Sequence, residues 1–285
     1  MKRIGLITLL AASALLNAAP AAGAESTAAS VTKSAGSVSA TVSWRKDGEF
    51  GAVRQPRLRV SRAGVIVTDM SLASACRMCS LIEDHTPPGD AAPYSILHVA
   101  DLDADGEPEV LLDVFSGGAH CCLSTRFFTY RPQSNTYKRA PSQYWGNVHY
   151  DVVDLDGDGR LELSGGDDSF AGAFSSSAGS AFPPLVIRYA VDPATGRSSL
   201  TNVTRRFPQV IRAEATRLLR KIRSAKPDPQ LFETQGALAA YVAGQYLLRR
   251  GSVGKAELAR ARRRKLTAPG FQTRLLRFLK QTGYR

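Results

Sequence analysis

The 285-residue chain carries a formal net charge of +12, and that charge is unevenly spread. Residues 205–285 hold 20 Lys and Arg against 4 Asp and Glu, whereas residues 1–204 hold 17 against 21. After residue 24 no stretch reaches about 18 uninterrupted apolar residues, which excludes a transmembrane helix from that part of the sequence.

The N-terminus has the pattern of a secretory signal peptide. Met1-Lys2-Arg3 is positively charged, the following residues to Ala19 are almost wholly apolar or small, and Ala22-Gly23-Ala24 fits a cleavage site. We therefore expect residues 1–24 to be a signal peptide and the protein to be secreted or periplasmic. Residues 25–36, rich in Ala, Ser and Thr, are expected to form a flexible leader.

Strand signals dominate residues 37–204, which predicts a β-rich domain. Ser39 to Trp44 alternates, and two short β-branched runs flank a turn at residues 62–64. Further strands are expected at residues 94–100, 110–115 and 123–130. Residues 165–184 form a long loop rich in Gly, Ser, Ala and Phe, and loops of this length often carry function.

Two copies of one acidic loop lie in this region. The loops begin at Asp101 and Asp154, 53 positions apart, and seven of the twelve positions aligned from Val99 and Val152 are identical. Ca²⁺ takes six to eight oxygen ligands, which carboxylates at loop positions 1, 3, 5 and 9 can supply, and glycine at position 6 permits the sharp turn. The carboxylates are Asp101, Asp103, Asp105 and Glu109 in the first loop, and Asp154, Asp156, Asp158 and Glu162 in the second. The backbone carbonyls of Glu107 and Arg160, at position 7, can complete each shell.

The surrounding sequence excludes an EF-hand. That motif needs a bidentate Glu at position 12 and a helix on both sides, but position 12 is Leu112 in one loop and Gly165 in the other, and the flanks are strands. A strand–loop–strand unit with D-x-D-x-D-G-x-x-E resembles the FG-GAP or VCBS-type repeat of integrin-α-like β-propellers and many secreted bacterial proteins. The resemblance covers about 20 residues in each copy, and it implies two calcium sites with the eight carboxylates as side-chain ligands.

The number of loops limits what the resemblance implies for the fold. Propellers typically close with four to eight blades, and residues 37–204 supply roughly three. We therefore predict an α+β protein in which a β-rich domain, partly propeller-like or sandwich-like, precedes a helical C-terminal region.

Four cysteines fit an exported protein. Cys76 and Cys79 form a C-x-x-C pair, and Cys121 and Cys122 are adjacent. We expect two disulfide bonds, with links between the two pairs preferred among three possible connectivities. A zinc site, with His120 as a substitute ligand, and a redox C-x-x-C are the alternatives. The segment from Ser116 to Cys122 resembles a signature beside such loops in uncharacterised exported bacterial proteins.

The sequence gives little support for catalysis. It contains no G-x-S-x-G elbow, H-E-x-x-H helix or P-loop. His120 could lie at a tight turn near a cleft, and Asp167 and Asp168 could be further ligands, although such residues more often cap a turn. We predict no catalytic residue. We expect an exported calcium-binding protein of the cell envelope or extracellular space that acts as a non-catalytic binding or structural module. The alternative is a calcium-stabilised hydrolase that acts on an envelope polymer.

Residues 205–285 are predicted to form three or four helices with apolar faces. Their positive charge suits an anionic envelope polymer or a lipid headgroup, whereas nucleic acid is a poor match for an exported protein. The densest run is Arg260, Arg262, Arg263, Arg264 and Lys265. The alternative is a solvated helical face with no ligand.

Overall fold

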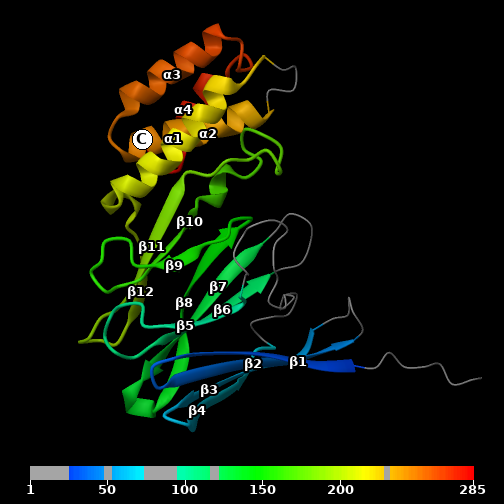
Figure 1. The fold of residues 1–285 in the computed structure, drawn as a ribbon, viewed down its shortest axis with the longest axis vertical. Helices are drawn as coiled ribbons and strands as arrows, with labels where there is room; N and C mark the ends of the chain where they lie inside the picture. The colour runs from blue at the N-terminus through cyan, green and yellow to red at the C-terminus, as the bar shows by residue number, and fades with distance from the viewer. Residues whose placement is uncertain (1–25, 48–52, 74–94, 116–121, 228–231) are drawn as a thin grey trace, which may run out of the picture.

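A computed structural model describes residues 26–47, 53–73, 95–115, 122–227 and 232–285. These residues form three four-stranded antiparallel sheets followed by four α-helices. The sheets follow one another along the long axis of the molecule, and the helices lie at the end farthest from the first sheet (Figure 1).

In each sheet the strands pair in the order in which they follow along the chain. The first sheet contains β1 (Ser26–Ala35), β2 (Val38–Asp47), β3 (Val53–Arg62) and β4 (Val65–Ser71). The second contains β5 (Leu97–Ala100), β6 (Glu109–Phe115), β7 (Leu123–Arg131) and β8 (Thr136–Gly146). The third contains β9 (Asp151–Val153), β10 (Glu162–Gly166), β11 (Pro184–Val191) and β12 (Ser198–Asn202).

The second sheet is covered on both faces, as the alternation of side chains along β6 makes possible. Val110 and Leu112 pack in a buried cluster with Leu58 of the first sheet. Leu111, between them in sequence, packs in another buried cluster with Leu163 and residues of the third sheet. Strand β6, which follows the first acidic loop, is therefore buried almost throughout and packs against both the first and the third sheet.

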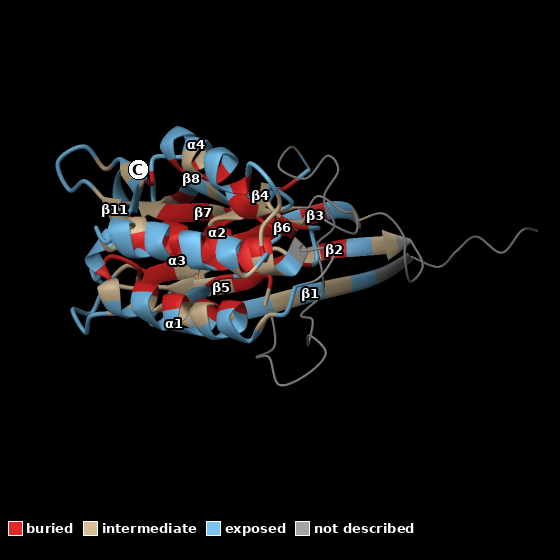
Figure 2. Ribbon diagram, turned by 90° about the horizontal axis from the view of Figure 1, so that it is seen from above, coloured by how far each residue is buried: buried red, intermediate tan, exposed pale blue. Residues whose placement is uncertain are grey.

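The helical region comprises α1 (Pro208–Ser224), α2 (Phe232–Leu247), α3 (Gly251–Arg263) and α4 (Phe271–Gln281). Helix α2 is buried along most of its described length and packs against α1 and α3. Along α1, buried and exposed residues alternate (Figure 2). Within the described ranges, no helix is both long and apolar enough to cross a bilayer.

The loop between β10 and β11 joins the helical region to the third sheet. Phe170, the last residue of the short 3₁₀ helix η2 (Asp168–Phe170), lies in the helical core, and Phe174 packs against that core. Phe170 makes edge-on contacts with Phe278 and Tyr284, at ring-centre distances of 5.0 and 5.5 Å. Phe174 contacts Phe278 in the same way at 5.2 Å. This loop is therefore a packing element.

Several sequence expectations are confirmed at this level. The α+β class, the β-rich part followed by helices, and the strands around residues 94–100, 110–115 and 123–130 are present. The described strands form three open sheets, and their arrangement does not decide between the propeller-like and the sandwich-like prediction.

One boundary prediction is wrong. Residues 26–35 of the expected flexible leader form β1, which pairs with β2 over ten residues. Ser and Thr alternate along part of this segment, and their hydroxyls pair across the sheet: those of Thr32 and Thr41 lie 2.8 Å apart, and Ser34 donates to Ser39 at 2.9 Å. The predicted signal peptide lies outside the described residues.

Candidate metal centre

Each acidic loop connects the first two strands of its sheet. The first lies between β5 and β6 and the second between β9 and β10. The loops also touch each other, since the Leu161 amide donates to the Leu102 carbonyl at 3.0 Å. The antiparallel pairing on both sides of each loop brings its position 1 and position 9 carboxylates together.

Side chains fold the two loops in closely similar ways. The position 1 carboxylate accepts from the backbone amide of the position 6 glycine, at 2.9 Å for Asp101 and 3.0 Å for Asp154. The position 9 carboxylate accepts from the amide at position 2, at 3.2 Å for Glu109 and 3.1 Å for Glu162. The glycines at position 6 have φ values of 87° and 84°, a conformation that costs other residues energy.

In the first loop three carboxylates converge. Asp101, Asp103 and Glu109 each offer an oxygen within 4.8 Å of those of the others. Calcium–oxygen distances of 2.3–2.6 Å place two ligands of one ion at most about 5 Å apart, so this group has the dimensions of a calcium shell. The side chain of Asp105 instead accepts from the Glu107 amide at 2.8 Å.

Two of these carboxylates are buried, and the positive charge near them does not offset the effect of burial on their pKa values. Glu109 is 1% exposed and Asp103 is 8% exposed. Burial raises the pKa of Glu109 to about 8, repulsion from Asp103 adds to the shift, and hydrogen bonds from Leu102 and Thr129 oppose it. Burial also raises the pKa of Asp103, and attraction to Arg160 only partly offsets this.

Asp103 also has an unsatisfied oxygen. Its Oδ2 accepts from the Val191 amide at 2.8 Å, but its buried Oδ1 has no hydrogen-bond partner among the described residues. A buried acceptor without a partner costs about 1–3 kcal/mol. A cation at this place would satisfy the oxygen and balance the charge, so the first loop fits Ca²⁺.

A polar hollow of about 450 Å³ lies beside the first loop, and Asp105 and Glu107 line it. The Glu107 carboxylate pairs with Arg62 at 2.7 Å and accepts from the Tyr137 hydroxyl at 3.2 Å. The side chain of Glu107 is therefore engaged elsewhere, in agreement with a role for its carbonyl alone. That role, like the one expected of the Arg160 carbonyl, stays a prediction.

The second loop contains its own cation. Asp154, Asp156 and Glu162 also converge within 4.8 Å, but Arg188 of β11 reaches into the loop. Its guanidinium donates to Glu162 Oε1 through Nε at 2.7 Å and also through a second nitrogen. It also contacts Asp158 at 3.2 Å and Asp156 at 3.4 Å.

Arg188 is firmly held in this position. It is 7% exposed and lies 5.9 Å from the ring centre of Phe207. Burial disfavours its charged form, but Glu162, Asp158 and Asp156 outweigh this and raise the pKa of Arg188. The sequence reading missed this residue. Its only signal is one charged side chain in the otherwise apolar run of β11.

The other candidate residues lie apart from the loops. Asp167 caps η2 through the Ser169 amide at 3.0 Å and accepts from the Tyr284 hydroxyl at 2.7 Å. Asp168 accepts from the Asn147 amide at 2.9 Å. The capping alternative is therefore confirmed for Asp167, whereas Asp168 ties η2 to the residue that follows β8.

Most of the cysteine and histidine predictions fall outside the described residues. Cys76, Cys79, His120 and Cys121 all lie there. No cysteine within the described part is a free thiol, and Cys122 Sγ accepts from the Tyr144 hydroxyl at 2.9 Å. The two disulfides and their pairing stay predictions.

The basic run at the end of α3 is partly used inside the protein. Arg264 donates to the carbonyls of Ile222, Arg223 and Ala225 at the C-terminus of α1, at 2.6–3.2 Å. Arg260 pairs with Glu257 at 3.6 Å. The remaining members, Arg262, Arg263 and Lys265, are exposed.

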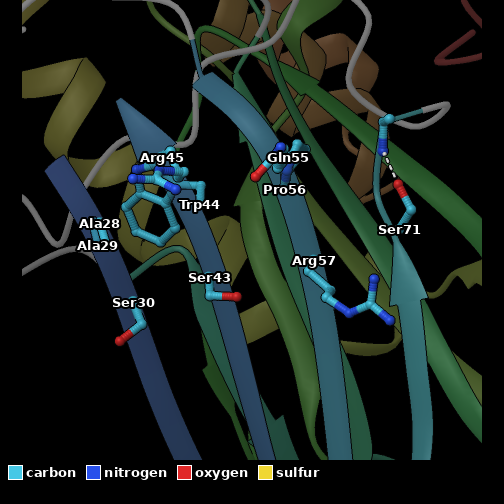
Figure 3. Close-up of a pocket in the computed structure, with 11 residues that line it drawn as sticks. Ala28, Ala29, Ser30, Ser43, Trp44, Arg45, Gln55, Pro56, Arg57 and Ser71 are labelled. Atoms are coloured by element: carbon cyan, nitrogen blue, oxygen red, sulfur yellow. Dashed lines mark hydrogen bonds between the residues drawn. The ribbon is translucent and has the colours of Figure 1, made fainter. Parts of the chain in front are cut away.

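A larger hollow, of about 740 Å³, lies on the first sheet (Figure 3). Trp44 of β2 and Arg57 of β3 are among the residues that line it. Among its described lining residues there is no carboxylate, histidine or cysteine. It therefore offers none of the side chains that acid–base catalysis or metal binding most often uses.

Comparisons with known proteins give one distant similarity. The chain matches no protein-family model, and no solved structure gives a significant match. It is 26% identical over 168 residues to a probable thylakoid lumen protein of Synechocystis sp.. The matched segment covers 55% of this chain and 44% of that protein, so the chain spans less than half of its relative's length.

Proposed function

We propose that this is an exported calcium-binding protein with a non-catalytic binding or structural role, and that the first acidic loop holds the ion. The observation that carries the proposal is the converging group of Asp101 with the buried Asp103 and Glu109, in which Asp103 Oδ1 has no hydrogen-bond partner among the described residues. An ion there joins β5 to β6 in the centre of the three-sheet stack, so it stabilises the part of the protein on which both neighbouring sheets pack.

The chemistry of the donors supports calcium over other metals. The converging group contains only carboxylate oxygens, which hard cations prefer, and has none of the nitrogen or sulfur ligands of a usual zinc site. Mg²⁺ requires near-ideal octahedral geometry at about 2.0–2.1 Å, whereas Ca²⁺ accepts the irregular arrangement that a short loop provides.

Two observations support export. The predicted signal peptide directs the chain out of the cytoplasm. The distant relative is named as a thylakoid lumen protein, which agrees with a compartment on the far side of a membrane. An oxidising compartment of this kind also suits the expected disulfides.

The ligand proposed for the helical region is an anionic envelope polymer or lipid headgroup. The exposed side chains of Arg262, Arg263 and Lys265 are free to contact such a ligand, whereas Arg264 is hydrogen-bonded to carbonyls at the end of α1. A salt-sensitive interaction follows because exposed charges are screened beyond about 8 Å at physiological ionic strength.

Thermal unfolding in chelator and in millimolar calcium tests the calcium proposal. An ion that binds only the folded state stabilises it by about 2.7 kcal/mol at a hundredfold excess over Kd, so the melting temperature should rise with calcium. The Asp103→Asn variant should lose this rise. Asp69→Asn, which removes an acid that pairs with Arg57 on the first sheet, is the control and should keep it. Superimposable melting curves of the wild type in chelator and calcium would refute the proposal.

A further inference from the structure

We propose that Arg188 takes the place of the cation in the second loop, so that the protein binds a single calcium ion, at the first loop. This inference rests on the proposed function and narrows it, because the sequence motif alone predicts two equivalent sites.

Strand register shows how the two units differ. In the third sheet Glu162 of β10 lies directly opposite Arg188 of β11. In the second sheet Val110 lies opposite Phe128, so the next step of the same register brings Glu109 opposite Thr129 of β7. Thr129 donates its hydroxyl to Glu109 Oε1 at 3.1 Å. The same position in the two repeats therefore carries a neutral hydroxyl in one unit and a guanidinium in the other.

The guanidinium occupies the oxygens that an ion would need. Arg188 contacts Asp156, Asp158 and Glu162, the carboxylates at positions 3, 5 and 9 of the second loop. Its planar fork satisfies several carboxylate oxygens at once, as calcium would. The first loop has no comparable occupant among the described residues, since the cation that acts on Asp103 is Arg160, which is exposed at the surface.

The positive charge of Arg188 opposes calcium binding in the second loop. A calcium ion would have to displace Arg188 from its carboxylates or bind beside its positive charge. Arg188 is buried and lies against Phe207, so displacement would also break packing. Repulsion at about 4 Å in a partly buried site weakens binding by at least on the order of a hundredfold.

The two loops therefore differ in their response to calcium. The first loop responds to calcium, whereas the second stays closed at any calcium concentration because its counter-charge is part of the chain. The third sheet, which carries the helical region, therefore keeps its hairpin when calcium is low.

Calcium titration calorimetry on the full exported chain, with melting curves of every variant, tests this inference. The wild type should bind one ion, Asp103→Asn should bind none, and Asp156→Asn should still bind one. Arg188→Thr, which copies the residue of the first unit, should bind two. Because that variant leaves Glu162 without its partner when calcium is absent, Thr129→Arg supplies the converse test. It should fold with the wild-type melting temperature in chelator and bind no ion.

The outcomes separate this inference from the proposed function. Two ions in the wild type, one of them lost in Asp156→Asn, would overturn the inference and leave calcium binding intact. A single ion lost in Asp156→Asn and kept in Asp103→Asn would overturn it too. No ion in the wild type would refute the proposed function. In that case a gain of one ion in Arg188→Thr would still support the role of Arg188, and no gain would overturn it.

Discussion

In the absence of calcium, substitutions of Arg188 and Glu162 should have strongly non-additive effects on the free energy of unfolding. Glu162 is 0% exposed, so Arg188→Met leaves a buried carboxylate without its main partner. Breaking a buried pair from one side costs about 3–5 kcal/mol. Glu162→Gln should cost less, about 1–3 kcal/mol, because Arg188 keeps Asp156 and Asp158 as partners.

The double variant decides whether these costs come from the pair. If they do, Arg188→Met/Glu162→Gln should be destabilised by clearly less than the sum of the two single changes. The coupling should lie at about 1–3 kcal/mol, the upper part of the range for residues in direct contact. Urea unfolding in chelator, with the slope checked for constancy, measures all four proteins.

The pair of Arg57 and Asp69 on the first sheet supplies the control cycle. Their side chains are 50% and 29% exposed, and exposed pairs contribute little to stability. We expect a coupling close to zero for this pair. A coupling between Arg188 and Glu162 that is no larger than that of the surface pair would refute the reasoning.

Two substitutions test the packing, and one thiol measurement tests the compartment. Phe170→Ala should lower the free energy of unfolding by about 3–5 kcal/mol in urea titrations, because its ring is 2% exposed and packs on Phe278; a loss below about 1 kcal/mol would contradict this. Tyr284→Phe removes the hydrogen bond to Asp167 and should cost about 1–3 kcal/mol in the same assay, whereas no loss would show that the bond contributes nothing. Alkylation under denaturing, non-reducing conditions, followed by intact mass measurement, should find no reactive thiol among the four cysteines; four labelled cysteines would reopen the zinc alternative.

The acidic loops could be predicted because their signal is local. Carboxylates two residues apart and a glycine at position 6 fold the chain around one point, and the loops at Asp101 and Asp154 do so through hydrogen bonds between residues a few positions apart. Short runs of β-branched residues predict the flanking strands in the same way. Each of these inferences needs only about a dozen neighbouring residues.

Arg188 could not be predicted because its role depends on register. It is 26 positions from Glu162, and the long loop between β10 and β11 leaves the alignment of the two strands open in the sequence. A shift of one residue would turn its side chain to the other face of the sheet. The role of Arg264 also depends on residues far away in the sequence, because its three backbone acceptors lie about 40 positions away.

The strand formed by residues 26–35 could not be predicted for a different reason. Its Ala, Ser and Thr are as common in linkers as in strands, and only the ten-residue pairing with β2 makes it a strand. The length of the loop that carries Phe170 suggests a function. In the structure its aromatic side chains pack against helices about 100 positions further along the chain.

The most direct measurement is anomalous diffraction from crystals grown with calcium, collected at a wavelength where the ion scatters measurably. We predict a peak between Asp101, Asp103 and Glu109, with carboxylate oxygens at 2.3–2.6 Å, and no peak among the carboxylates that Arg188 contacts. Saturating calcium with no peak at the first loop would contradict the account. A peak at the second loop, with the Arg188 side chain displaced from Glu162, would contradict the claim that this loop carries its own cation.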